Sequence, residues 1–298
     1  MKTKVGICGY GWVGKSMHKL FPDALIHDPF YTSIEDGAFK ISYPQEKVNQ
    51  CDIAFICVPT PNLKECKCEC HQGVVSACTP KSGKCWFCDA LYAAPVCNGR
   101  LDVSIVEEVV SWCECPLIVI RSTVNPGDCD YLEKKYNKHI VYQPEYLGET
   151  PNHPLFDPKK RPFLIIGGSR TEDRRKLIEL YTTVYNANVT IRQTPLMHAE
   201  IIKLSENRAI AFKVAQCQEL YDVCEKTGVD YYSIRDAVYS DDPRFNLWWT
   251  FVFPDKRGMN SKCIPKDVYA WCAFAESAGY DPKITKALLE KNKEWIND

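Results

Sequence analysis

The sequence predicts the α/β fold class: a doubly wound parallel sheet followed by an all-helical domain. Short apolar runs alternate with helix-like stretches over the first two thirds of the chain, which is typical of repeated βα units. A glycine-rich turn follows the first apolar run, and a long helical pattern begins near residue 195. Since 298 residues leave room for about two domains, we expect a dinucleotide-binding domain over 1–194 and a helical domain over 195–298.

Composition argues against several classes of partner. A formal net charge of −1 gives no reason to expect nucleic acid or a membrane surface as a partner. No apolar run approaches the length of a membrane span. The opening MKTKVGICGYGWVG indicates a first strand and not a signal peptide, because glycines interrupt its apolar stretch. We therefore expect a cytoplasmic protein whose thiols are reduced.

The first motif is a GxGxxG turn formed by Gly9, Gly11 and Gly14. It lies between an apolar run, Val5–Cys8, and a helix-like stretch, Trp12–Leu20. In a Rossmann-type domain the first glycine permits the tight turn, the second lets the backbone approach a pyrophosphate, and the third lets the helix pack on the strand. A glycine-rich turn of no function is the alternative, but the flanking strand and helix favour dinucleotide binding.

An acidic residue follows the second apolar run. Ala24–Ile26 ends in His27-Asp28. A carboxylate at the end of the second strand binds ribose hydroxyls and favours NAD over NADP. Asp28 is therefore the residue that we expect to select NAD.

The remaining α/β elements alternate in the same way. The expected strands are Ile53–Val58, Leu117–Ile120, Ile140–Tyr142, Phe163–Ile166 and Val189–Ile191, and the expected helices are Val103–Val110, with Asp102 as a possible N-cap, and Arg174–Val184. Ligands of such sheets lie beyond the carboxyl ends of the strands. Thr60, Thr123 and Glu145 all fall at such ends. Each could equally be a loop residue that caps a turn.

A long helix is predicted over residues 195–225. Apolar residues recur there at helical spacing, and no glycine or proline interrupts the pattern before Gly228. Lys203 and Asn207 are four residues apart and share one face of this helix. A lysine in this position is a solvated rim residue unless its face meets the cofactor site.

A candidate nucleophile lies within the stretch GMNSKCIPKD, residues 258–267. Proline is favoured in the first turn of a helix, so Pro265 predicts a helix that begins just after Cys263. Peptide dipoles at a helix N-terminus lower a thiol pKa, and Lys262 and Lys266 add positive charge nearby. A buried structural cysteine is the alternative.

Together these motifs resemble the UDP-glucose/GDP-mannose 6-dehydrogenase family, the NAD-dependent four-electron oxidases of nucleotide sugars. The matching stretches occur in the family's order and are VGICGYGWVG, FICVPTP, RLDVSIVEE, IRSTVNPGD, QPEYLGE, AEIIKLSENRAIAFK, DPRFN and GMNSKCIPKD. They cover most of the chain outside a cysteine-rich block. The combination of Cys-x-Pro-Lys-Asp with Glu145 and Lys203 is specific.

The resemblance implies a two-step oxidation. NAD accepts a hydride from the sugar C6 alcohol, Cys263 attacks the aldehyde to form a thiohemiacetal, a second hydride transfer gives a thioester, and water releases the uronic acid. Lys203 and Asn207 would stabilise the substrate oxyanion.

Further roles follow from the resemblance alone. Thr123 and Asp267 would hold the hydrolytic water, and Glu145 would be its general base. The implied NAD-binding positions are Gly9, Gly11, Trp12, Val13, Gly14, Asp28, Val58, Pro59, Thr60 and Thr123. The implied substrate positions are Glu145, Tyr146, Leu147, Lys203, Asn207, Arg244 and Gly258.

The chain departs from the family's pattern in three places. Asn260 and Ser261 occupy positions where paired glycines are expected. The family's C-terminal nucleotide-binding domain is expected to be absent, because the sequence ends at Asp298. Residues 62–98 form an insertion where the family has a short loop, and we expect it near the mouth of the cofactor site.

The insertion predicts a structural zinc site. Its eight possible soft ligands are Cys66, Cys68, Cys70, His71, Cys78, Cys85, Cys88 and Cys97. Tetrahedral zinc takes four Cys or His ligands, so eight could hold two ions. Disulfides or an unstructured loop are the alternatives.

The sequence therefore favours an NAD-dependent nucleotide-sugar dehydrogenase, with a homodimer through the long helix implied by the resemblance. A dehydrogenase of a smaller sugar or hydroxy acid is a second possibility. A catalytically silent binding protein is a third, and the joint presence of the six catalytic candidates argues against it.

Overall fold

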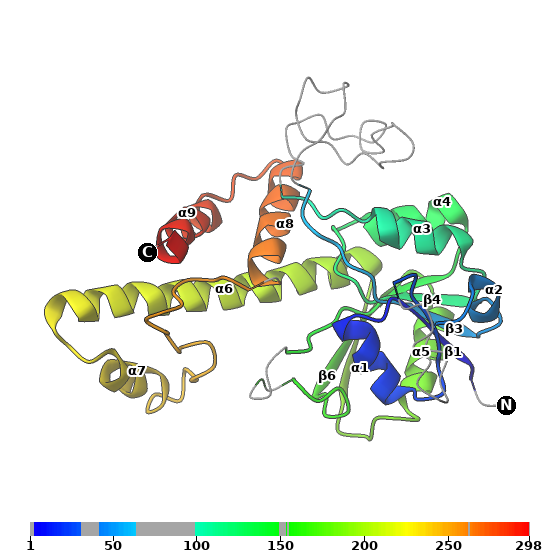
Figure 1. The fold of residues 1–298 in the computed structure, drawn as a ribbon, viewed down its shortest axis with the longest axis horizontal. Helices are drawn as coiled ribbons and strands as arrows, with labels where there is room; N and C mark the ends of the chain where they lie inside the picture. Colours follow the sequence, from blue (N-terminus) through cyan, green and yellow to red (C-terminus); the bar gives the residue numbers. More distant parts are fainter. Residues whose placement is uncertain are drawn as a thin grey trace. The chain divides into compact units, whose positions relative to one another are not determined.

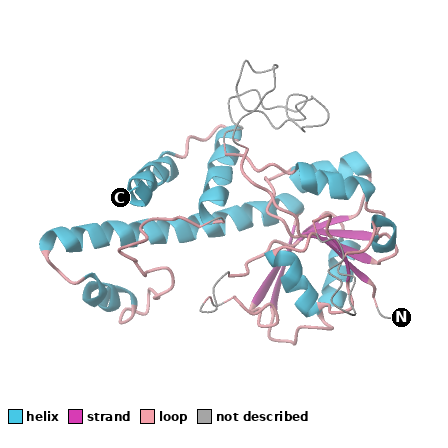
Figure 2. Ribbon diagram, viewed as in Figure 1, coloured by secondary structure: helices cyan, strands magenta, loops and turns pink. Residues whose placement is uncertain are grey.

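The computed structural model describes residues 3–30, 42–63, 99–148, 153, 155–261 and 263–297 (Figures 1 and 2). The chain divides into two compact units. Unit 1 comprises Met1–Pro61 and Leu101–Lys203, and unit 2 comprises the described residues of Asn62–Arg100 and Leu204–Asp298. The division within the second half of the chain falls between Lys203 and Leu204, inside the long helix.

Unit 1 is built on a seven-stranded sheet of order β2-β1-β3-β4-β5-β6-β7. The strands are β1 Val5–Cys8, β2 Leu25–His27, β3 Ile53–Ile56, β4 Leu117–Ile120, β5 Ile140–Tyr142, β6 Phe163–Gly168 and β7 Thr190–Thr194. All neighbouring pairs are parallel except β5 and β6, which are antiparallel. The predicted doubly wound parallel sheet therefore contains one antiparallel pair, because strand direction depends on the connection and not on the local apolar pattern.

Apolar residues hold the sheet between two layers of helices. The central strands β1, β3 and β4 are buried throughout, as continuous apolar runs require when both faces are covered. Met17 of α1 (Trp12–Leu20) and Leu177 of α5 (Thr171–Tyr181) pack on one face. Helices α3 (Ser104–Trp112) and α4 (Asp128–Tyr136) lie on the opposite side of the sheet in Figure 1.

Two of the helices in unit 1 had not been predicted. The short α2 (Gln45–Val48) and α4 contain few apolar residues, so they show little of the periodicity by which helices are recognised. Gly127 begins α4 with a left-handed φ of 97°. A polar sequence such as DCDYLEKKY becomes helical here because its neighbours bury Cys129 and Leu132.

Unit 2 is helical, and the predicted fold class is confirmed. Its elements are most of α6 (Leu196–Thr227), then α7 (Tyr231–Tyr239), α8 (Ile264–Ser277) and α9 (Lys283–Asn297). Gly228 ends α6 with a left-handed φ of 69°. The side chain of Asp230 caps α7 by accepting a hydrogen bond of 2.8 Å from the Ser233 backbone N–H.

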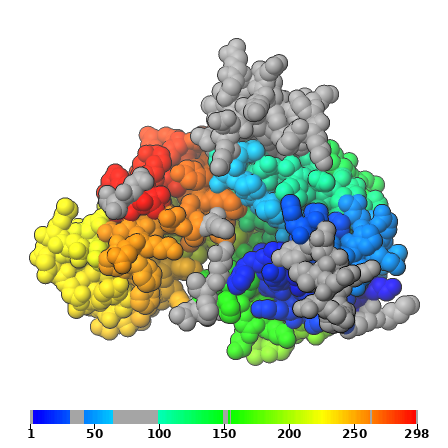
Figure 3. All heavy atoms as spheres, viewed as in Figure 1, coloured from blue at the N-terminus to red at the C-terminus, as the bar shows by residue number. Residues whose placement is uncertain are grey.

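Unit 2 has small apolar clusters and an exposed aromatic segment. Ala211 and Met259 lie in one cluster with residues of α8 and α9, and Tyr231 and Val252 lie in another. Phe245, Trp248, Phe251 and Phe253, which precede α8, are exposed; their segment and α7 form part of the visible surface in Figure 3. Within the described part of the chain, no helix combines the length and apolar character needed to cross a membrane.

The glycine turn gives a matched stability test. A Cβ on Gly14 would lie 2.0 Å from the carbonyl oxygen of Gly9, whereas a Cβ on Gly11 would meet no atom within 4 Å. We expect Gly14→Ala to lower the free energy of unfolding by about 1–3 kcal/mol, since overpacking of this kind forces the backbone apart. Gly11→Ala, the control, should change it by less than about 0.5 kcal/mol. Urea unfolding measures both, and equal effects would contradict this account of the turn.

Candidate functional site

The turn after β1 has the shape of a phosphate cradle. Gly9 has a φ of +92°, and a Cβ there would lie 2.6 Å from the Cys57 carbonyl oxygen. The first and third glycines of the motif are thus required by the fold itself. Gly11 leaves open space at the N-terminus of α1, where peptide N–H groups attract an anion. The residues present therefore fit the pyrophosphate of a dinucleotide.

Asp28 lies beside this turn. Its side chain is buried, and its two oxygens accept hydrogen bonds from the backbone N–H groups of Tyr10, at 2.6 Å, and Phe30, at 2.9 Å. These bonds fix the carboxylate at the end of β2, next to the cradle. In that position it can accept hydrogen bonds from ribose hydroxyls and repel a 2′-phosphate.

Two further loops that the sequence analysis selected are adjacent to each other. Val58, Pro59 and Thr60 follow β3, and Thr123 follows β4, the neighbouring strand. The Ser122 hydroxyl donates a hydrogen bond of 2.7 Å to the Val58 carbonyl, which ties the loops together. Thr60 is buried and Thr123 half-buried. Trp12 and Val13, also selected, begin α1, and Trp12 is half exposed.

Glu145 is held between two arginines. Its carboxylate forms ion pairs with Arg121 and with Arg161, the latter at 2.7 Å. Burial alone would raise the pKa of Glu145, but the two guanidinium groups outweigh burial and hold the pKa below its usual value. The carboxylate is therefore ionised at neutral pH and is a weak base.

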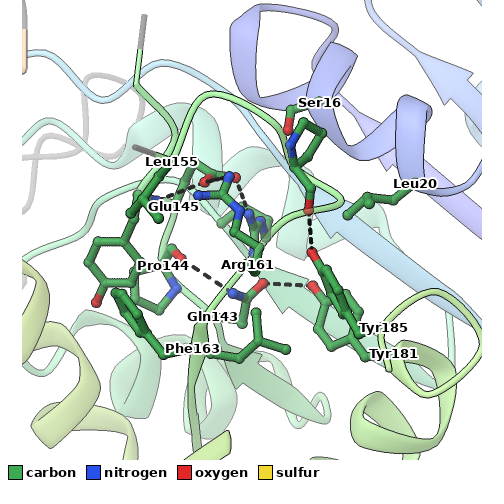
Figure 4. A pocket seen from close by; sticks show the side chains of 14 residues that line it. Ser16, Leu20, Gln143, Pro144, Glu145, Leu155, Arg161, Phe163, Tyr181 and Tyr185 are labelled. Carbon is green, nitrogen blue, oxygen red and sulfur yellow. Dashed lines mark hydrogen bonds and ion pairs between the residues drawn. The ribbon is translucent and has the colours of Figure 1, made fainter. Parts of the chain in front are cut away.

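Behind Glu145 lies a cavity of water size. Its volume is about 10 Å³, and Figure 4 shows Glu145 and Arg161 pointing toward each other at its edge. Gln143 accepts a hydrogen bond of 2.7 Å from the Tyr181 hydroxyl on another side. A cavity this small holds about one water molecule and no sugar.

Lys203 contacts the residue that follows Glu145. Its ammonium lies 4.8 Å from the centre of the Tyr146 ring, a distance typical of a cation–π interaction. Lys203 is buried, so it is not a solvated rim lysine. Its functional role stays a prediction. Leu147, also selected, is half-buried.

The sequence motifs do not point to Glu200, which lies one turn before Lys203. Its fully buried carboxylate accepts hydrogen bonds from the backbone N–H groups of Gly127, at 2.5 Å, and Cys129, at 2.9 Å. It thereby caps α4 from α6. Burial raises the pKa of Glu200 to about 8, although both hydrogen bonds oppose that shift. An acidic residue three positions before Lys203 on one helix face was the signal in the sequence.

Cys263 is the N-cap residue of α8, as predicted. Its side chain is exposed, and its carbonyl oxygen accepts a hydrogen bond of 3.1 Å from the Asp267 N–H. Pro265 lies in the first turn. The other nine cysteines among the described residues are buried, so Cys263 is the accessible thiol of that part of the chain. Lys262, its neighbour, lies outside the described residues.

Asn207 and Asp267 meet in the interior of unit 2. The Asn207 amide donates a hydrogen bond of 2.5 Å to one oxygen of the Asp267 carboxylate, and the Lys266 ammonium contacts the other oxygen at 2.7 Å. Asn207 and Asp267 are both buried. Two residues sixty positions apart, both of which the resemblance implies to be catalytic, are thus direct partners.

The two remaining predicted substrate residues lie elsewhere in unit 2. Arg244 is largely exposed, pairs with Asp242, and lines a groove of about 520 Å³ with Lys213 and other residues. Gly258 has a φ of +69°, and a Cβ there would lie 2.9 Å from the Asn292 side-chain oxygen. Close packing against α9 is therefore sufficient to explain why position 258 is a glycine.

The predicted zinc ligands, from Cys66 to Cys97, all lie outside the described residues. Among the residues that are described, no group of three or more His, Cys, Asp or Glu side chains is arranged to hold a metal ion. The zinc prediction stays a prediction.

Comparison with known proteins adds independent evidence. Residues 197–294 match the model of the UDP-glucose/GDP-mannose dehydrogenase family, central domain. The UDP-glucose 6-dehydrogenase of Rickettsia bellii is 29% identical over 208 residues, which cover 66% of this chain and 46% of the relative. That of Rickettsia typhi is 31% identical over 182 residues, covering 59% and 41%. The chain thus spans less than half of the length of these relatives.

The fold has a counterpart among solved structures. A UDP-glucose dehydrogenase from Pyrobaculum islandicum superposes with a TM-score of 0.73 at 20% identity, covering 99% of this chain and 68% of the other. At 20% identity this match shows a shared fold and nothing about function. Residues 197–294 thus resemble the central domain of the UDP-glucose/GDP-mannose dehydrogenase family, and the Rickettsia sequences show a similarity to members of the same family over about two thirds of this chain.

Proposed function

We propose that this protein oxidises the C6 alcohol of a nucleotide sugar, of the UDP-glucose type, to the uronic acid in two NAD-dependent steps. The observation that carries the proposal is the exposed Cys263 thiol at the N-terminus of α8, in the same turn as the buried Asp267 that Asn207 binds. A thiol at a helix N-terminus has stabilised thiolate character, which covalent catalysis requires.

NAD would be held by the glycine cradle and Asp28, and when bound it supplies the hydride acceptor for both oxidations. The Cys263 thiolate adds to the aldehyde carbon and holds it first as a thiohemiacetal and then as a thioester. The Lys203 ammonium stabilises negative charge on the substrate oxygen, and Asn207 supports the same oxygen. Attack of water on the thioester releases the acid and returns the thiol.

The water would be positioned by Thr123 and Asp267, with Glu145 as the proton acceptor. Its two guanidinium partners keep the Glu145 carboxylate ionised at neutral pH but lower its basicity. We therefore propose that Glu145 acts by orienting the water and taking its proton late in the step, when the attacking oxygen has become more acidic.

The proposal includes a homodimer, a nucleotide-sugar substrate with Arg244 near the sugar, and structural zinc held by the Cys66–Cys97 ligands. The decisive experiment incubates the purified protein with NAD and a panel of nucleotide sugars, small sugars and hydroxy acids, and counts NADH per molecule oxidised. Two NADH per uronic acid supports the proposal. One NADH from a small hydroxy acid favours the smaller-substrate alternative, and no NADH from any compound favours a binding protein.

Asp28 should select the cofactor. We expect at least about tenfold tighter binding of NAD than of NADP, because placing a 2′-phosphate against a carboxylate costs more than 1 kcal/mol. Asp28→Asn should reduce this preference, and fluorescence titration with both dinucleotides measures it. Asp52→Asn is the matched control, since Asp52 is also a carboxylate that accepts a backbone N–H, from Lys4, but is exposed. Equal affinity of the wild type for both dinucleotides would remove this role from Asp28.

Cys263 should be needed for the second oxidation and not for the first. Cys263→Ala should lower acid formation by at least about 10³-fold while leaving slow oxidation to the aldehyde. Cys263→Ser should be nearly as damaging, because an alkoxide forms far less readily than a thiolate at neutral pH. Mass spectrometry of the product together with NADH stoichiometry separates the two steps. Acid formed at the wild-type rate by the alanine variant would exclude the thioester route.

The purified protein should contain zinc. Replacing Cys85 and Cys88 together by Ser should lower the zinc content, because the Cys-x-x-Cys pair has ligand spacing. Elemental analysis of protein purified without chelator measures this loss. The control is Cys263→Ser, which should keep the full zinc content. A zinc-free wild type would count against the metal site.

A further inference from the structure

Four described residues flank residues 64–98, two on each side. We call Asn62, Leu63, Gly99 and Arg100 the neck. The Leu63 backbone N–H donates a hydrogen bond of 2.7 Å to the Arg100 carbonyl, and the Asn62 side-chain amide donates one of 2.5 Å to the Gly99 carbonyl. The two chain segments are thus tied together by one backbone bond and one side-chain bond.

The neck is attached to the first turns of α8. The second N–H of the Asn62 amide donates a hydrogen bond of 3.0 Å to the Lys266 carbonyl oxygen, 204 residues along the chain. Gly99 has a φ of +96°, and a Cβ there would lie 3.0 Å from the Tyr269 carbonyl oxygen and 3.1 Å from its Cβ. Residues 266 and 269 are three apart and share one face of the helix. The neck therefore packs on α8 at two consecutive places, and both lie in unit 2.

This contact falls in the turn that Cys263 begins. The field of a helix dipole at its N-terminus depends on the alignment of the first peptide units and falls off within one turn. Lys266 is three residues after Cys263, and its carbonyl group belongs to that turn. A side chain that fixes the Lys266 carbonyl group thereby fixes part of the array of dipoles that acts on the thiol.

We propose that Asn62 is a positioning residue for Cys263: its amide joins the neck to the first turn of α8 and holds that turn in the geometry that activates the thiol. The effect on the thiol rests on geometry alone, and only its catalytic consequence rests on the function proposed above. Both donor hydrogens of one amide are used, one on each partner. Gly99 contributes through its lack of a side chain.

The test measures the rate at which Cys263 reacts with iodoacetamide in the full-length protein at pH 7, by mass spectrometry of its peptide. Asn62→Ala removes the amide, and Asn62→Leu removes its hydrogen bonds but keeps a similar volume. Both should slow the reaction about two- to fivefold, the size expected when helix-dipole stabilisation of an exposed group is partly lost. Gly99→Ala, which pushes the neck away from Tyr269, should slow it in the same direction.

Asn49 provides the matched control. Its amide also joins backbone groups, donating to the Trp112 carbonyl at 3.1 Å and accepting from the Glu114 N–H at 2.9 Å, but it lies in unit 1. Asn49→Ala and Asn49→Leu should leave the alkylation rate of Cys263 unchanged.

Several results would overturn the proposal: a wild-type rate in both Asn62 variants, a wild-type rate in Asn62→Leu alone, or equal slowing in the Asn49 controls. Should the Asn62 variants not fold, the rate in Gly99→Ala decides. The assay needs no substrate, so it separates this proposal from the proposed function. Slower alkylation in the Asn62 variants, with no oxidation of any nucleotide sugar by the wild type, would support the role of Asn62 and contradict the proposed function. Oxidation of a nucleotide sugar by the wild type, with unchanged alkylation in the Asn62 variants, would support the proposed function and contradict the role of Asn62.

Discussion

The buried hydrogen bond between Asn207 and Asp267 is the interaction on which the helical unit depends. It joins α6 to the first turn of α8 where both side chains are excluded from water. Removing Asn207 would take the amide from one oxygen of the buried Asp267 carboxylate, at a cost of about 1–3 kcal/mol. Asp267 is also the residue whose N–H closes the first turn on the Cys263 carbonyl. One bond therefore supports the packing of α8 and the geometry of its N-terminus.

Helix α6 carries three polar side chains on one side at successive turns, Glu200, Lys203 and Asn207. All three are buried, which is costly for polar groups unless each has a partner. Glu200 caps α4, Lys203 lies against Tyr146, and Asn207 binds Asp267. These polar groups lie among buried apolar side chains of the same helix, such as Leu204 and Ala211. Polar contacts make the position of the helix more specific, because each requires a defined geometry.

Local sequence patterns were sufficient for β1, β4, β5 and α1, whose bounds were predicted residue for residue. The glycine turn could also be predicted from the sequence, because the role of each glycine depends on neighbouring residues of the same motif. The antiparallel β5–β6 pair and the clamp of Arg121 and Arg161 on Glu145 were not predicted. Both arise from pairings that only the folded chain brings about, and no periodicity encodes which arginine meets which carboxylate.

The neck fixes the two ends of residues 64–98, which the sequence predicts to be an insertion. Each doubling of loop length costs only about 0.6 kcal/mol in closure entropy once the ends are fixed. Asn62 and Leu63 fix those ends through hydrogen bonds to Gly99 and Arg100. Among the described residues, the contacts from the neck to α8 are made by the Asn62 amide and the Gly99 backbone. The neck is thus joined to the turn of α8 that begins at Cys263 through groups that have a defined geometry.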